Sequence, residues 1–236
     1  RGVNVSHPRH PPCGKLWKWR LSLRPRTLAL TVLAALTASG ASAQKLDGAA
    51  LATALRQGGY VILMRHAHAP ETPPSAAEAD RANGHRERQL DAAGRASAKA
   101  MGEAMRTLHV PVGAVWSSPT YRARETARLA GLRAPRIAAE LGDNGRSMQG
   151  TNSGQADWLL ARANEKPRPG TDTVIVTQYP NISGAFGEAA AGMKDGEALV
   201  FRPAAGPAAQ LLGRIAIEQW SVLARPPQPG KRHHEG

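Results

Sequence analysis

The sequence predicts an α/β domain, a three-layer sandwich with a mainly parallel central sheet flanked by helices. Short apolar runs typical of buried strands, such as Tyr60–Met64 and Thr173–Thr177, alternate with stretches of helical periodicity. Apolar residues make up 42% of the 236 residues, which is enough to build a core. Cys13 is the only cysteine, so a disulfide scaffold and a cysteine-based zinc site are excluded.

Residues 1–43 have the pattern of a leader with a secretory signal peptide. A basic stretch precedes the mostly apolar run Thr27–Leu36, and the small residues Ala41–Ala43 follow as a cleavage site. Such a run is too short to cross a bilayer, which needs ~20 residues. We therefore expect export, to a bacterial periplasm, with no integral membrane segment after cleavage. Because the leader is long and opens with Arg1, we also expect a mis-called start upstream.

The predicted domain covers residues 44–225 and is moderately basic. Seven of the 31 Lys and Arg residues lie in the leader, so 24 basic and 18 acidic residues remain in residues 44–236, a net charge of +6. Residues 226–236 are Pro-rich and basic, which predicts a disordered tail. The hypothesis that the protein is a basic binder of envelope components or nucleic acid is supported by this charge alone. We expect no nucleic-acid partner.

The predicted elements follow in the order of an α/β fold. A helix over Gly48–Arg56 ends at two glycines before the first strand, and the loop 69–86 has no period. Asp91 caps a predicted helix that runs to about Leu108. The later predicted elements are a strand Val110–Ser117, helices Tyr121–Leu129 and Trp158–Ala163, strands Thr173–Thr177, Ala198–Phe201 and Gln210–Ile217, and a turn Glu218–Leu223.

Polar residues follow three of the predicted strands. The first strand ends in Arg65 and His66, the second in Ser117–Ser118 with Arg122 one helical turn later, and the third in Thr177–Gln178. Ligands of such sheets bind at the carboxyl ends of the strands. Arginines that converge there favour an anion such as phosphate, and an imidazole among them is a potential nucleophile. One Arg-His pair is more often a surface feature, but three strand ends together favour a site.

Four segments in this order resemble signatures of the histidine phosphatase superfamily, which includes phosphoglycerate mutase. Met64–Ala67 resembles the Arg-His-Gly signature, with Ala in place of Gly. Three further segments are similar to the family's later signatures: Leu90–Arg95, Val115–Ala127 and Val174–Gly184. Details at Arg88–Leu90, Asn181–Gly184 and Gly196–Glu197 look most like the exported branch that includes lipopolysaccharide core heptose phosphatase.

The resemblance implies a phosphomonoesterase that works through a phosphohistidine. His66 would be the nucleophile, and Arg65 and Arg122 would hold the phosphoryl oxygens. Arg88 and Asn181 are further candidates for substrate binding, with a solvated loop residue as the alternative for Arg88. The substrate would be a small phosphorylated compound such as a sugar phosphate, and no metal or other cofactor is implied.

Gln178 departs from the family, which has a second histidine at this position. An amide can donate a hydrogen bond to phosphate but cannot carry positive charge. The loss of one preorganised donor of this kind typically reduces the rate by ~10²–10³. The alternative function is therefore a catalytically degenerate, phosphate-binding module of the cell envelope. His68 is a candidate to replace the missing imidazole.

The proton donor for the leaving group is open between two carboxyl groups. Glu140 follows the second signature, roughly where one branch of the family has its acid, and Glu197 follows the third. Either residue has a solvated surface carboxylate as its alternative. Glu125 is expected to face the cations of its own helix.

Overall fold

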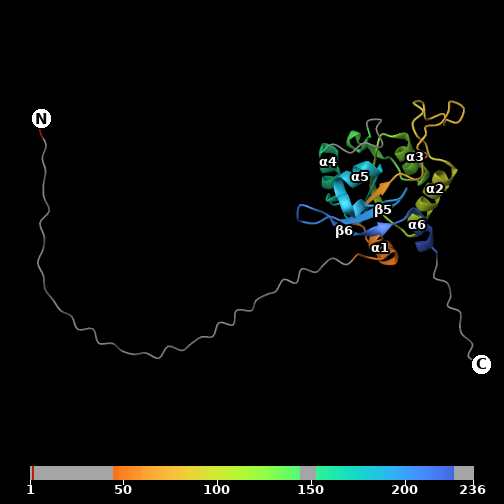
Figure 1. The fold of residues 1–236 in the computed structure, drawn as a ribbon. Helices are drawn as coiled ribbons and strands as arrows, with labels where there is room; N and C mark the ends of the chain where they lie inside the picture. Colours follow the sequence, from red (N-terminus) through yellow and green to blue (C-terminus); the bar gives the residue numbers. More distant parts are fainter. Residues whose placement is uncertain (1, 3–44, 144–152, 226–236) are drawn as a thin grey trace, which may run out of the picture. The chain divides into compact units, whose positions relative to one another are not determined.

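The structure, a computed structural model, describes residues 2, 45–143 and 153–225. Contacts divide the chain into Arg1–Gly40 and Ala41–Gly236, and every described helix and strand belongs to the second unit (Figure 1). The predicted signal peptide and the predicted tail lie outside the described residues. None of the described helices is both long and apolar enough to span a bilayer.

The described strands form one six-stranded sheet in the order β3-β2-β4-β1-β5-β6. The first four of these pair in parallel, whereas β5 pairs antiparallel with both β1 and β6. The mainly parallel sheet that the sequence predicts is thus confirmed, with an antiparallel pair at one edge. The strands are β1 (Val61–Arg65), β2 (Val112–Ser117), β3 (Arg136–Ile137), β4 (Asp172–Thr177), β5 (Ala198–Arg202) and β6 (Gln210–Ile215).

Helices cover both faces of the sheet and complete the three layers (Figure 1). One layer holds α1 (Gly48–Leu55), α2 (Ala92–Thr107), α3 (Tyr121–Leu129) and α6 (Ile217–Leu223). The other layer holds α4 (Ser153–Ala163) and α5 (Tyr179–Phe186), with the short 3₁₀ turns η1 (Ala139–Leu141) and η2 (Gly187–Ala190) beside it.

Alternation along β1 divides the apolar interior into two cores. Ile62 and Met64 pack with the α1, α2, α3 and α6 layer, and Val61 and Leu63 pack with the α4 and α5 layer. All four side chains are at most 1% exposed. A strand covered on both faces must be apolar at every position, which is why the run before Arg65 shows no polar alternation.

Several elements differ from the predictions. Residues 217–223 form the helix α6 rather than a turn, and α4 begins at Ser153, earlier than expected. The helix α5 was not predicted, because Pro180 and the small polar residues after it are poor helix formers. Pro180 is tolerated because it lies in the first turn, where no backbone N–H is needed.

Candidate active site

The carboxyl ends of β1, β4 and β2 lie next to one another at one edge of the sheet. The backbone N–H of His66 donates to the carbonyl of Thr177 over 2.9 Å, and that of Ser118 donates to the carbonyl of Val176 over 2.9 Å. The parallel ladders therefore extend one residue past the strand ends, and these bonds fix His66, Ser118 and Thr177 side by side. The structure thus brings together the polar strand ends expected from the sequence.

His66 is 2% exposed and is held as a neutral imidazole. Its Nδ1 lies 2.7 Å from the carbonyl oxygen of Ala67, and Nε of Arg122 donates to its Nε2 over 3.1 Å. Because a carbonyl can only accept, Nδ1 carries the proton and Nε2 carries the lone pair. Burial, together with the positive charges of nearby arginines, lowers the pKa of His66 to about 3, although the bond to Ala67 acts in the opposite direction.

Arg122 connects the imidazole to an acidic residue that sequence reasoning missed. It lies in the first turn of α3 and is 2% exposed. Besides its bond to His66, its Nη2 donates to Oδ2 of Asp143 over 2.5 Å. The ion pair with Asp143 orients the guanidinium group and keeps it beside His66. Asp143 lies three residues after Glu140, and it has no spacing motif of its own that would single it out.

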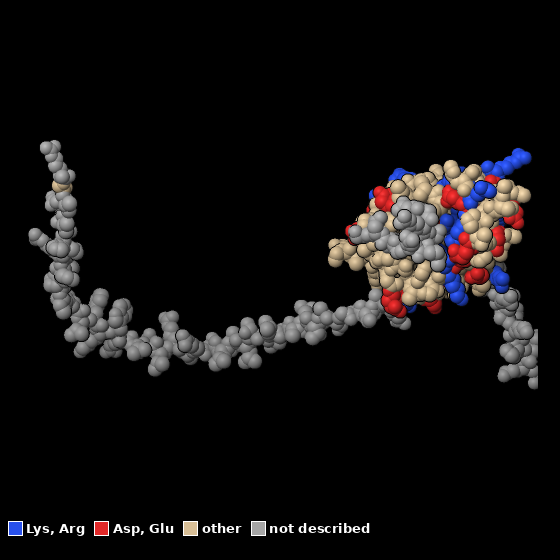
Figure 2. All heavy atoms as spheres, turned by 45° about the horizontal axis from the view of Figure 1, so that its top comes forward, with Lys and Arg blue, Asp and Glu red and all other residues tan. Residues whose placement is uncertain are grey.

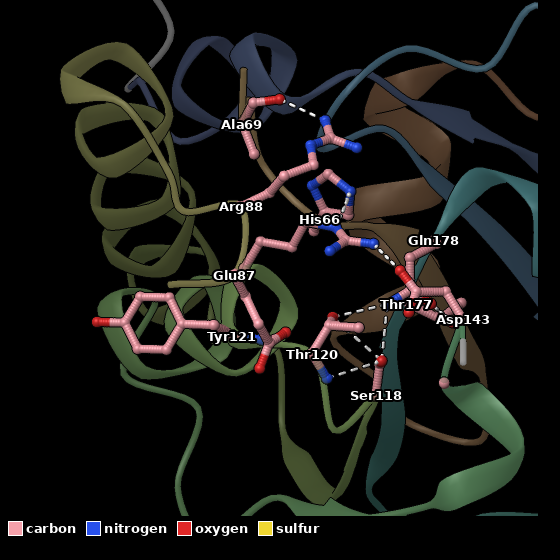
Figure 3. Close-up of polar contacts among 12 residues, drawn as sticks. His66, Ala69, Glu87, Arg88, Ser118, Thr120, Tyr121, Asp143, Thr177 and Gln178 are labelled. Atoms are coloured by element: carbon pink, nitrogen blue, oxygen red, sulfur yellow. Dashed lines mark hydrogen bonds and ion pairs between the residues drawn. The ribbon is translucent and has the colours of Figure 1, made fainter. Parts of the chain in front are cut away.

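Arg88 lies beside His66 and is buried, so the solvated-loop alternative is wrong (Figure 3). Its Nε donates to the carbonyl of Pro70 and its Nη2 to the carbonyl of Ala69, each over 2.6 Å. Nη2 also lies 3.0 Å from a carboxylate oxygen of Glu71. These bonds tie the two ends of the long loop together and hold the positive charge of Arg88 at the site.

Asn83 holds the backbone that carries Arg88. Its Nδ2 donates to the carbonyl of Glu87 over 2.7 Å, and its Oδ1 accepts from the N–H of the same residue over 2.9 Å. The side chain is 3% exposed. A buried amide that satisfies both backbone groups of one residue restricts the neighbouring position, so Asn83 restricts the backbone of Arg88. Its place in an aperiodic loop left no sequence signal.

Arg65 is held by the loop before β5. Its Nη1 donates to the carbonyl of Met193 over 3.1 Å, and its Nη2 lies 2.6 Å from Oδ1 of Asp195. The other oxygen of Asp195 lies 3.9 Å from Nε2 of His68, whose Nδ1 lies 2.9 Å from Asp91. His68 is half exposed, and its ring nitrogens face these two carboxylates. These contacts do not place it where it could replace the missing imidazole.

Gln178 is 1% exposed, and its amide is fully engaged. Its Nε2 donates to the hydroxyls of Ser118 and Thr120, each over 2.7 Å. Its Oε1 accepts from the hydroxyl of Thr177 over 3.0 Å and from Asn181 over 3.3 Å. Both amide hydrogens are therefore used within the protein, which differs from the phosphate-donating role expected of Gln178. Figure 3 shows this cluster beside His66.

Asn181 has a structural place in the same cluster. Its Nδ2 donates to the carbonyl of Leu141 over 2.8 Å and lies 3.0 Å from the hydroxyl of Thr177. These bonds join α5 to the ends of η1 and β4. In this structure the donor group of Asn181 faces the protein rather than a substrate.

The two candidate proton donors have different surroundings. Glu140 is exposed on η1. Glu197 is bound on both oxygens, because Oε1 accepts from Nε of Arg214 over 2.6 Å and Oε2 from the N–H of Lys194 over 2.8 Å. Burial works to raise the pKa of Glu197, but these partners outweigh it and lower that pKa. A carboxylate held in its charged form is a poor proton donor, so Glu197 is better suited to fixing the loop that holds Arg65.

Glu125 faces cations, as expected from the sequence. It is 5% exposed, and one of its oxygens lies 2.7 Å from both Arg95 and Arg128. Arg95 lies in α2, so these ion pairs connect α2 to α3. Figure 2 shows basic and acidic side chains close together on the right-hand part of the domain. Within residues 45–143 and 153–225, no three His, Cys, Asp or Glu side chains gather as they would around a metal ion.

A neutral buried imidazole between arginines, at the carboxyl edge of a parallel sheet, is the arrangement that the sequence signatures imply. Residues 61–150 match the family model of the histidine phosphatase superfamily (branch 1). This segment is therefore similar to the histidine phosphatase superfamily. The match includes β1 with His66 and the first turn of α3 with Arg122.

A solved structure with a TM-score of 0.50 shows the same fold. A structure of the protein histidine phosphatase SixA complexed with tungstate has a TM-score of 0.50 and 16% identity, covering 68% of this chain and 98% of that chain. A phosphoserine phosphatase mutant from Entamoeba histolytica in complex with phosphoserine has a TM-score of 0.46 and 11% identity, covering 67% and 98%. None of the curated protein sequences compared with the chain matches it.

Proposed function

We propose that this chain is a phosphomonoesterase of the histidine phosphatase superfamily that uses Nε2 of His66 as its nucleophile. The observation that carries the proposal is the state of His66: the ring is buried and neutral, and its Nε2 lone pair is directed at Arg122. A neutral imidazole nitrogen is the form that attacks phosphorus. The three arginines near the ring supply positive charge for a phosphoryl group.

The reaction has two steps. Nε2 of His66 forms a bond to phosphorus while the bond to the leaving oxygen breaks, and that oxygen takes up a proton from water. Water then attacks the phosphohistidine, releasing inorganic phosphate and restoring the imidazole. Arg122 donates to Nε2 in the free protein, so its Nε–H must turn to a phosphoryl oxygen when the substrate enters. Asp143, which holds the other end of the guanidinium group, keeps Arg122 at the site during this change.

The test is phosphate release by the purified full-length chain on a panel of aryl and sugar phosphates without added metal. We expect turnover and an acid-labile phosphoenzyme in the wild type, and neither in His66→Ala. The exposed His109 offers a matched control, since His109→Ala should leave both unchanged. Turnover that survives in His66→Ala would exclude the mechanism.

A second candidate function is a phosphate-binding module with little turnover. It is favoured by the cluster around Gln178, whose two amide hydrogens are bound to Ser118 and Thr120. The site therefore lacks both the second imidazole of the family and a free donor at that position. Such a site would bind a phosphorylated ligand without stabilising the extra charge of the transition state.

Substitution of Gln178 separates the two functions. If the missing imidazole limits turnover, Gln178→His should raise kcat by about tenfold or more, which corresponds to about 1.4 kcal/mol of barrier. Gln178→Asn is the control, because it shortens the side chain and disturbs the bonds to Ser118 and Thr120 without adding an imidazole. Equal activities of the two variants would show that the imidazole is not the missing element.

We also propose that the domain works outside the cytoplasm on a small phosphorylated compound. The leader pattern of residues 1–43 supports export to a periplasm, and the likeness of Arg88–Leu90 to the exported branch supports a sugar phosphate of the envelope. Fractionation of cells that produce the full chain tests this localisation. Retention of uncleaved chain in the cytoplasm would contradict it.

A further inference from the structure

A basic cavity lies at the β2–β3 edge of the sheet and shares no lining residue with the His66 site. It has a volume of about 420 Å³ and lies between β2, β3 and the segment that follows α4. Cavities of about 300–1,000 Å³ are the usual size of small-molecule sites. Its wall includes Trp116, Arg136, Arg162, Lys166 and Arg168.

The cavity carries positive charge that the described part of the chain does not balance. Five of its 13 lining residues are Lys or Arg, and Glu165 is the one acidic residue among them. Glu165 is already paired with Arg162. Arg133, Arg136 and Lys166 form no ion pair with any described residue. An anionic ligand would therefore meet several cations without first displacing a carboxylate.

Aromatic rings hold part of this charge in place. The guanidinium carbon of Arg162 lies 4.7 Å from the ring centroid of Trp116 and 5.2 Å from that of Trp158. Arg136 lies 5.4 Å from the Trp116 ring, and the two indoles meet edge to face at 5.6 Å. Cation–π contacts of this kind order the arginines before any ligand arrives. Binding then costs less conformational entropy, because these side chains are already ordered.

We propose that this cavity binds a small ligand that carries a chain of two or more phosphate groups. Several unpaired cations around one cavity match a ligand with several negative charges. The planar fork of arginine matches phosphate oxygens through paired donors. Free polyphosphate and a nucleoside triphosphate share this chemistry. The site is separate from the phosphoryl site at His66 and does not depend on the proposed reaction.

The test uses tripolyphosphate and ATP as probes on the full chain, with the indole N–H resonances as the readout. Trp116 and Trp158 line or border the cavity, and Trp→Phe variants assign their signals. We expect both probes to shift these resonances, in the wild type and in His66→Ala alike. Neutralising Arg136 and Lys166 together, as Arg136→Gln with Lys166→Gln, should weaken the affinity by about tenfold or more. Arg56→Gln, on an exposed arginine of the same domain, is the matched control.

Four other outcomes would each overturn the proposal. Indole resonances that stay unmoved by millimolar tripolyphosphate would show that no such site exists. Equal affinity in the double variant and in Arg56→Gln would show that the cavity cations are not the ligands. Binding of ATP with no effect of tripolyphosphate would reject recognition through the phosphate chain, and equal binding of citrate would reject selectivity for phosphate.

Discussion

The Nε–H of Arg122 donates to Nε2 of His66 over 3.1 Å, so the lone pair proposed as the nucleophile is occupied in the free protein. This bond fixes the orientation of the ring, and the bond from Nδ1 to the carbonyl of Ala67 fixes its tautomer. The neutral state follows from burial among arginines rather than from a neighbouring base. The nucleophile is therefore ready without first losing a proton.

The first prediction concerns the acid side of the pH profile. Because the pKa of His66 is lowered to about 3, its imidazole should stay neutral well below the ordinary value of 6.5. We expect the loss of activity that comes from protonation of His66 to begin only near pH 4. The measurement is kcat/KM from pH 3.5 to 8, together with the ¹⁵N resonances of His66, assigned with His66→Ala. A His66 titration near pH 6.5 would contradict this reading.

The lowered pKa of His66 also makes the stability of the fold depend on pH. Between pH 6.5 and about 3 the unfolded chain binds a proton at His66 that the folded chain does not bind. The contribution of His66 to stability is therefore present above pH 6.5 and is lost as the pH falls toward 3. In His66→Ala this part of the pH dependence should disappear, which urea unfolding at pH 7 and pH 4.5 would show.

The second prediction concerns Asn83 as a positioning residue. Asn83→Ala removes two buried bonds to the backbone of Glu87, which should lower stability by about 1–3 kcal/mol. Since the backbone of Arg88 is then less restricted, KM for a phosphate ester should rise roughly tenfold, about 1.4 kcal/mol of binding, with a smaller change in kcat. Ser75→Ala is the control, because Ser75 lies in the same loop and its hydroxyl donates to the exposed Glu78. An unchanged KM in Asn83→Ala would leave the residue with a purely structural role.

Sequence patterns predict the parts of this site that depend on strands. The runs before His66, Ser118 and Gln178 are mostly apolar, because β1 and β4 are covered on both faces and β2 is covered in part. A polar residue after such a run marks the strand end. These local signals suffice to place three strand ends at one edge of a sheet.

The partners of the arginines could not be predicted in the same way. Asp143 meets Arg122 across 21 residues and Asp195 meets Arg65 across a larger separation, so neither pairing has a local period. The strand β3 has only two residues, and its pairing with β2 is a tertiary effect. The hydrogen bonds of the Gln178 amide likewise depend on the hydroxyls of Ser118 and Thr120, which follow β2.

The third prediction concerns Gly94, which lies in the segment that resembles a family signature. A Cβ at this position would lie 2.1 Å from the carbonyl oxygen of His68, two residues after the nucleophile. Gly94→Ala must therefore push α2 away from the segment that follows β1, and overpacking of this kind costs about 1–3 kcal/mol. Gly84→Ala is the control, because its Cβ would meet nothing within 4 Å. Equal urea midpoints for the two variants would show that α2 can shift freely.

The fourth prediction concerns Asp172, which is fully buried at the start of β4. Its Oδ1 accepts from the N–H of Tyr60 over 2.9 Å, whereas its Oδ2 is buried with no partner among the described residues. Burial raises the pKa of Asp172 to about 7, against the weaker opposite effect of the bond from Tyr60. Between the ordinary carboxyl value and pH 7, the folded chain therefore holds a proton that the unfolded chain has lost.

Stability should fall as the pH rises through this window, by up to about 4 kcal/mol if the whole shift is realised. Asp172→Asn keeps an acceptor for Tyr60 and cannot ionise, so its stability should lose this dependence and exceed that of the wild type at pH 8. Urea unfolding at pH 5 and pH 8 measures the effect, with Asp157→Asn, an exposed carboxylate on α4, as the control. The same pH dependence in Asp172→Asn and the wild type would mean that Asp172 is ionised in the folded chain and that water reaches its second oxygen.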